Sequence, residues 1–120
     1  MIDPALGPAI DAVTDASFDA EVVASPTPVL VEFGASWCPP CRAMAPVLAD
    51  VARERAGRLR VVTVDWDENH RHADRLGVMA VPTLFLFSNG SVVHRIAGYT
   101  AKPRLLRIVD ELLAGRLPSR

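Results

Sequence analysis

Basic residues are missing from the first 41 positions of the chain, and the formal net charge of all 120 residues is -1. This charge pattern offers no positive patch for nucleic acid or an anionic membrane, so we expect neither as a partner. Apolar runs long enough to cross a bilayer are missing too. The first ten residues, MIDPALGPAI, lack the basic start and the apolar stretch of a secretory signal, so we expect a cytoplasmic protein.

Cysteine is scarce, with only Cys38 and Cys41 in the chain. Cytoplasmic thiols are normally kept reduced, so two cysteines separated by two residues indicate redox or metal chemistry rather than a structural disulfide. Internal repeats and low-complexity segments are also absent, and 120 residues suffice for one hydrophobic core but not for two. We therefore expect one domain at 10–115, a flexible leader at 1–9 and a tail at 116–120.

Hydrophobic patterns predict alternating strands and helices along this domain. Continuous β-branched and apolar runs are typical of strands that are buried on both faces, and the Asn-Gly pair at 89–90 is typical of a tight hairpin. The predicted strands lie at 10–13, 29–33, 61–64, 83–87 and 91–96. Apolar residues at helical spacing and the glycines that follow them predict the helices. These lie at 17–23, from the cysteines to Gly57 with a kink at Pro46, at 70–76 and at 102–114.

The resulting order of elements, βαβαβαββα, predicts an α/β fold. A strand that is followed by a helix and another strand usually pairs in parallel with that second strand, whereas the hairpin makes the last two strands antiparallel. The sequence therefore predicts a mixed central sheet with helices on both faces.

The two cysteines lie at the start of the second helix, directly after a buried strand. A helix N-terminus stabilises negative charge, which favours the thiolate of Cys38, the form that attacks disulfides. Cys41 follows three residues later, a spacing that brings the two side chains to about 5 to 6 Å in a helix and permits a disulfide. Pro39 and Pro40 fit this turn because the first amides of a helix have no partner within it.

A zinc site is the alternative interpretation of the cysteine pair, with His70 and His72 as the remaining ligands. Two histidines separated by one residue on a short helix do not point to the same face, which makes this alternative weaker. A pair of cysteines without any function is a further alternative.

Four segments resemble the thioredoxin family: AVTDASFDAEV, VLVEFGASWCPPCRAMAP, VPTLFLFSNG and RIAGYT. The resemblance extends from Ile10 to Ala114 without an insertion. It implies a thioredoxin fold, an exposed attacking Cys38, a recessed resolving Cys41 and a cis peptide bond before Pro82, which would align the substrate. In this reaction the Cys38 thiolate attacks a disulfide of another protein, and Cys41 then releases the reduced target.

Glu32 interrupts an otherwise apolar strand six residues before Cys38, where the family carries a buried acid. Burial raises the pKa of a carboxyl group, so we expect Glu32 to act as the proton acceptor of Cys41. The family usually has aspartate at the position of Glu32. Three further residues depart from the family pattern: Pro39 replaces a glycine between the cysteines, Gly34 replaces a common tryptophan, and Thr63 replaces a lysine that would neighbour the buried acid.

We expect an extended segment of the substrate to pair with the backbone of Val81, next to Cys38. A shallow apolar docking surface would surround this point. The substrate-binding candidates are Trp37, Pro39, Pro40, Val81, Gly98 and Tyr99.

The resemblance also implies the partners. The chain binds no cofactor or metal itself, and a separate thioredoxin reductase returns electrons from NADPH to the dithiol of a monomeric protein. The substrates are disulfide-containing proteins. Two other functions stay open at this point: a thioredoxin-fold binding module with a structural role, and an oxidase or isomerase that uses the same chemistry.

Overall fold

The computed structural model describes residues 10–117. The predicted leader at 1–9 and the last three residues of the predicted tail lie outside this range. The elements are β1 (Asp11–Ala12), η2 (Asp19–Val23), β2 (Val29–Gly34), α1 (Pro39–Glu54), β3 (Arg60–Asp65), α2 (Arg71–Arg75), β4 (Thr83–Ser88), β5 (Ser91–Ala97) and α3 (Lys102–Leu113). Their order confirms the predicted βαβαβαββα sequence, although η2 is a π-helix.

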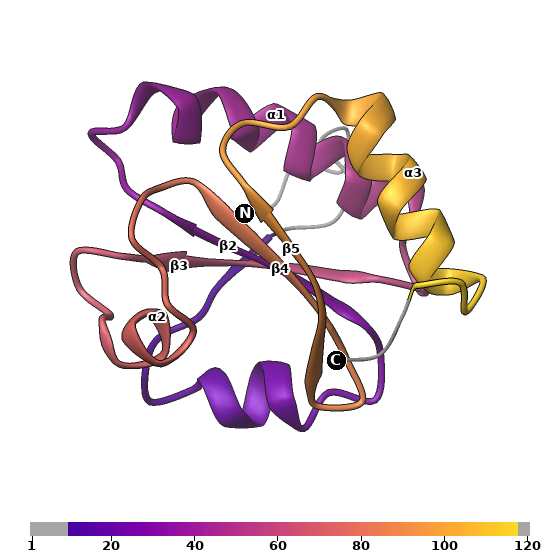
Figure 1. The fold of residues 1–120 in the computed structure, drawn as a ribbon, viewed down its shortest axis with the longest axis horizontal. Helices are drawn as coiled ribbons and strands as arrows, with labels where there is room; N and C mark the ends of the chain where they lie inside the picture. The colour runs from indigo at the N-terminus through magenta and orange to yellow at the C-terminus, as the bar shows by residue number, and fades with distance from the viewer. Residues whose placement is uncertain (1–9, 118–120) are drawn as a thin grey trace, which may run out of the picture.

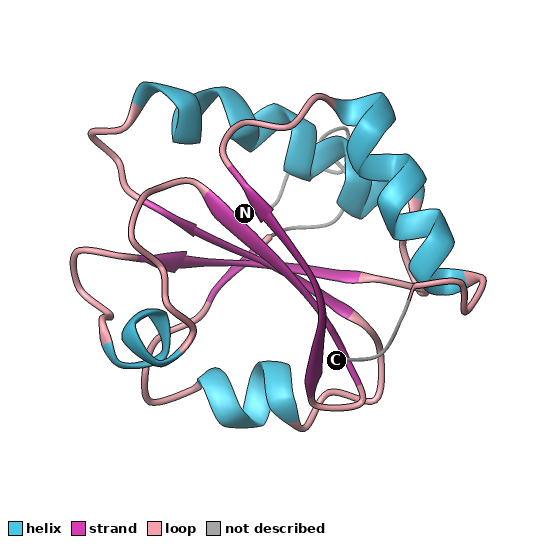
Figure 2. Cartoon of the chain, viewed as in Figure 1, coloured by secondary structure: helices cyan, strands magenta, loops and turns pink. Residues whose placement is uncertain are grey.

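The five strands form one mixed sheet in the order β1-β3-β2-β4-β5. β2 lies at the centre, parallel to β3 and antiparallel to β4, and β1 is parallel to β3. Helices α1 and α3 cover one face of this sheet, and η2 and α2 cover the other (Figures 1 and 2). The predicted sheet with helices on both faces is therefore confirmed.

Each face of the sheet carries its own hydrophobic core. Because side chains alternate along a strand, β2 sends Leu30 toward α1 and α3, and Val31 and Phe33 toward η2 and α2. Met44 and Leu48 of α1 complete the first core. β2 is buried along its whole length, as its apolar sequence predicts for a central strand.

The second helix begins and ends close to the expected positions. Pro39 and Pro40 occupy its first turn, and α1 then continues through Pro46 to Glu54. Arg55, just after the helix, donates two hydrogen bonds to Asp110 of α3, at 2.7 and 2.8 Å. Within residues 10–117, every helix is too short or too polar to cross a bilayer.

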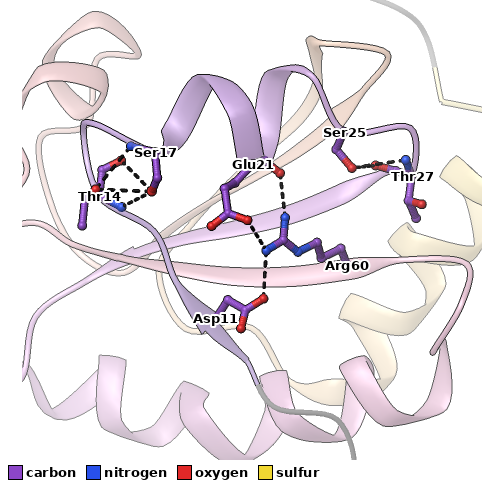
Figure 3. A network of polar contacts seen from close by, with 7 residues as sticks. All are labelled: Asp11, Thr14, Ser17, Glu21, Ser25, Thr27 and Arg60. Carbon is purple, nitrogen blue, oxygen red and sulfur yellow. Dashed lines mark hydrogen bonds and ion pairs between the residues drawn. The ribbon is translucent and has the colours of Figure 1, made fainter.

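Arg60 of β3 joins the first two elements to the sheet (Figure 3). Its guanidinium lies 2.8 Å from a carboxylate oxygen of Asp11 in β1 and 2.8 Å from one of Glu21 in η2. It also donates to the Glu21 backbone carbonyl at 2.9 Å. These ion pairs are partly exposed, so they add little to the stability of the fold and mainly orient β1 and η2 relative to β3.

Two short or irregular strands form the edges of the sheet. β1 contributes only two residues, and the pairing of β5 with β4 shifts register between Leu86 and Phe87. The predicted hairpin joins β4 and β5, with positive φ at both Asn89 and Gly90. A Cβ atom at Gly90 would also lie 3.1 Å from the Val23 carbonyl oxygen, so this turn has no room for a side chain.

Candidate active site

Cys38 and Cys41 lie at the N-terminus of α1, where β2 has just ended at the middle of the sheet. Cys38 is the N-cap residue, and its sulfur accepts a hydrogen bond from the Cys41 backbone N–H at 3.3 Å. Pro39 and Pro40 have no N–H to offer, so this bond comes from the first available amide of the helix. Both cysteines are free thiols.

The expectation that Cys38 is exposed is wrong for this reduced form. Cys38 is 3% exposed and Cys41 is 8% exposed, so Cys38 is the more covered of the two. The cause is tertiary packing, because Ala35 and Val81 lie against the cysteine pair.

The Val81–Pro82 peptide bond is cis, as the resemblance implied. The carbonyl oxygen of Val81 lies 3.6 Å from the Cys38 sulfur and accepts its S–H. On the other side of the loop, Gly98 donates its N–H to the Pro82 carbonyl at 2.8 Å. The structure thus brings Val81 to the sulfur of Cys38 and joins Gly98 to Pro82, the next residue of the same loop.

The outer residues of the expected docking surface are exposed. Trp37 and Tyr99 are at least half exposed, and Pro39 and Pro40 face solvent on the first turn of α1. The sequence analysis missed two residues of this region. Asp67 accepts the Trp37 indole N–H at 2.7 Å, and Met79, two residues before Val81, is 87% exposed.

Glu32 is buried at the level of the cysteines, as the apolar strand around it predicted. It pairs with Thr63 of β3 and Leu84 of β4, neither of which is charged. Burial raises the pKa of its carboxyl group from 4.5 to about 7. One carboxyl oxygen, Oε2, has no hydrogen-bond partner among residues 10–117.

The pKa of the Cys41 thiol is raised as well. Burial is the main cause that raises its pKa from 9.0 to about 12. The hydrogen bond with Cys38 and the negative charges of Cys38 and Glu32 raise it further, while a backbone hydrogen bond with Ala35 opposes them. The Cys41 thiol is therefore protonated in neutral solution.

A cleft of about 320 Å³ opens beside these two groups. It runs between the ends of β2 and β3 and the first turns of α1. Its lining residues are Ala12, Glu32, Gly34, Ala35, Ser36, Cys41, Arg42, Ala45, Thr63, Val64 and Asp65. A larger cavity of about 370 Å³, beside Gly57 and Arg60, lies at the other end of α1 and is remote from the cysteines.

The two histidines of the zinc alternative lie in different environments. His70 is exposed at the N-cap of α2, whereas His72 is buried with its ring stacked on Phe18 at 4.2 Å. Within the described residues, no three side chains of His, Cys, Asp or Glu converge as a metal site would require.

Comparisons with known proteins agree with this geometry. The family model described as Thioredoxin matches residues 9–111. The chain is 46% identical to the thioredoxin of Mycobacterium bovis over 101 residues, which are 84% of this chain and 87% of the relative. It is 42% identical to thioredoxin 1 of Synechococcus elongatus, covering 85% of this chain and 95% of that one. It is also 45% identical to the bifunctional thioredoxin reductase/thioredoxin of Mycobacterium leprae, over 84% of this chain but 22% of that protein.

Proposed function

The chain belongs to the thioredoxin family of disulfide reductases, and from this premise we propose that Cys38 and Cys41 reduce disulfides in other proteins. The observation that carries this assignment is the Cys38 sulfur at the helix N-terminus, hydrogen-bonded to the Cys41 amide and facing the Val81 carbonyl. This arrangement supports one attacking thiol and one resolving thiol on a single turn.

In the first step, the Cys38 thiolate attacks one sulfur of the target disulfide. A bond forms between Cys38 and that sulfur, and the other target sulfur leaves as a thiolate that takes a proton from water. The amide of Cys41 and the N-terminus of α1 stabilise the attacking anion. The target is then held as a mixed disulfide.

In the second step, the Cys41 sulfur attacks Cys38 and displaces the remaining target thiolate. The target has gained two electrons, and Cys38 and Cys41 are left as a disulfide. Cys41 must first lose a proton, which its raised pKa makes difficult. Glu32 accepts this proton, because its own pKa of about 7 leaves much of it ionised in neutral solution.

Substrate docks around Val81, whose backbone groups pair with an extended segment of the target. Pro82 aligns that segment by turning the Val81 carbonyl toward Cys38. Apolar side chains of the target rest on the surrounding surface. Its residues are Trp37, Pro39, Pro40, Val81, Gly98 and Tyr99.

The oxidised dithiol is returned to its reduced form by a separate thioredoxin reductase that draws electrons from NADPH. The Mycobacterium leprae relative, a bifunctional thioredoxin reductase/thioredoxin, supports this pairing. We propose further that a single domain at 10–115 acts as a monomer in the cytoplasm.

Reduction of insulin disulfides by catalytic amounts of the protein tests the proposal. With dithiothreitol as electron source, precipitation of the insulin B chain should begin much earlier than in a control without protein. A binding module would leave the onset unchanged. The reduction potential of the dithiol, measured against glutathione, separates a reductase from an oxidase or isomerase, since a reductase requires the lowest of the three potentials.

A further inference from the structure

The backbone conformation at Gly34, the last residue of β2, does not require glycine. Its φ lies outside the positive range, which distinguishes it from Gly57, Gly77 and Gly90. The explanation lies in the space beside it. Residues two apart in a strand point to the same face, so a side chain at position 34 would stand next to Glu32.

That space is already filled by the Glu32 carboxyl group. A Cβ atom at Gly34 would lie 3.1 Å from Oε1 and 3.3 Å from Cδ of Glu32, closer than the roughly 3.5 to 4.0 Å of a favourable carbon contact. The same atom would lie 3.6 Å from Cys41 Cβ. Glu32 and Cys41 therefore both border the position that a Cβ atom at residue 34 would take, and the absence of a side chain at Gly34 leaves room for the Glu32 carboxyl group.

The cleft reaches the same position. Glu32, Gly34 and Cys41 all line it, and its volume of about 320 Å³ is far more than one water molecule needs. Glu32 is 6% exposed, and its Oε2 atom lacks a hydrogen-bond partner in the part of the chain that the structure describes. An unpartnered carboxyl oxygen at the wall of a roomy cleft calls for a hydrogen bond from water.

Building on the proton-acceptor function proposed for Glu32, we propose that Gly34 is a positioning residue that keeps the cleft open to the Glu32 carboxyl. The Cys41 thiol gives its proton to Glu32, and the carboxylic acid then passes it to water in the cleft. No electron moves in this transfer, and the base is regenerated for the next turnover.

The charged and titratable groups around this path are few. Glu32 comes from β2, Cys41 and Arg42 from α1, and Asp65 from the end of β3. On the neighbouring strands, Thr63 and Leu84 flank Glu32 without a charge. The one cation among these cleft residues, Arg42, donates to the Ser36 carbonyl at 2.9 Å, so we assign stabilisation of the Glu32 carboxylate to water in the cleft.

Substitution Gly34→Ala tests the proposal, since a methyl group there displaces water and crowds Oε1. The side-chain carbon of Glu32, followed by ¹³C NMR, should titrate with a midpoint raised by about half a pH unit or more. Resolution of the mixed disulfide, followed by stopped-flow mixing at pH 7, should slow at least threefold. Glu32→Asp in the Gly34→Ala protein should recover part of this rate, because the shorter acid withdraws from the methyl group.

Glu32→Gln supplies the matched background. If Gly34 acts through the acid, Gly34→Ala should leave the resolution rate of the Glu32→Gln protein unchanged. Equal slowing in both backgrounds would show a merely structural effect and overturn the proposal, as would an unchanged NMR midpoint.

The function of Glu32 itself is judged separately. If the mixed disulfide is resolved as fast in the Glu32→Gln protein as in wild type, Glu32 is not the proton acceptor. The positioning function of Gly34 is then refuted too, even if the NMR midpoint of Glu32 rises in the Gly34→Ala protein. If resolution is slow in the Glu32→Gln protein but the NMR midpoint of Glu32 is unchanged in the Gly34→Ala protein, only the positioning function of Gly34 is refuted.

Discussion

Replacing Glu32 by glutamine should make the fold more stable at neutral and alkaline pH. The substitution keeps the size of the side chain and removes its ability to ionise. In wild type the buried carboxyl has a pKa of about 7, whereas the same group in the unfolded chain ionises near its ordinary value of 4.5. Folding and ionisation of Glu32 therefore oppose each other.

The sign and the magnitude follow from these two values. Below pH 4.5 the acid is protonated in both states, and ionisation costs the folded protein nothing. Between pH 4.5 and 7 the unfolded chain releases the proton first, so the free energy of unfolding falls as pH rises; above pH 7 the loss levels off. One pKa unit corresponds to about 1.4 kcal/mol, which makes the total loss about 3 kcal/mol. This loss is a large part of the free energy of unfolding of a typical domain, which is about 5 to 15 kcal/mol.

Urea melts of the reduced proteins at pH 4, 5.5, 7 and 8.5 measure this effect. The free energy of unfolding of Glu32→Gln, relative to wild type, should rise by about 3 kcal/mol from the lowest pH to the highest. Glu68→Gln, the same change at an exposed position after β3, serves as control and should show no comparable trend. A difference between Glu32→Gln and wild type that stays constant with pH would refute the reasoning.

Three further predictions concern the dithiol and the hairpin. Cys38→Ser should abolish insulin reduction, whereas Cys41→Ser should still capture targets as mixed disulfides on non-reducing gels; equal capture by both would contradict their assignment. Pro39→Gly should raise the reduction potential by on the order of 30 mV in glutathione equilibration, because an added N–H can stabilise the Cys38 thiolate and with it the reduced form of the dithiol; a lower potential would contradict this. Gly90→Ala should cost about 1 to 2 kcal/mol in urea melts, since φ is positive and the Val23 carbonyl is close, and an unchanged midpoint would count against it.

Much of the fold follows from local patterns in the sequence. The runs at 29–33 and 83–87 are apolar on both faces, and this property places them in the middle of a covered sheet. The Asn89-Gly90 pair defines the hairpin without any help from distant residues. The sequence predicts a helix at η2 but not its π-helical form. The two kinds of helix differ in their hydrogen bonds, and a segment of five residues is too short for its apolar spacing to distinguish them.

The candidate site was less completely predictable, because several of its properties arise from contacts between distant segments. The burial of Glu32 could be inferred from its neighbours in the strand. The burial of Cys38 depends on Val81, 43 residues later, and no local pattern reveals it. The hydrogen bond from Trp37 to Asp67 is of the same kind, since an acidic residue in a polar turn gives no sign of its partner.

The edges of the sheet have a consequence for the behaviour of the protein at high concentration. A flat, unpaired edge strand is a template on which another chain can add, and such addition leads to aggregation. Here β1 offers only two residues, and β5 is bent by its register shift and carries Arg95, whose guanidinium lies over the Phe85 ring and donates to the Leu76 and Gly77 carbonyls. Both edges therefore discourage self-association through strand pairing.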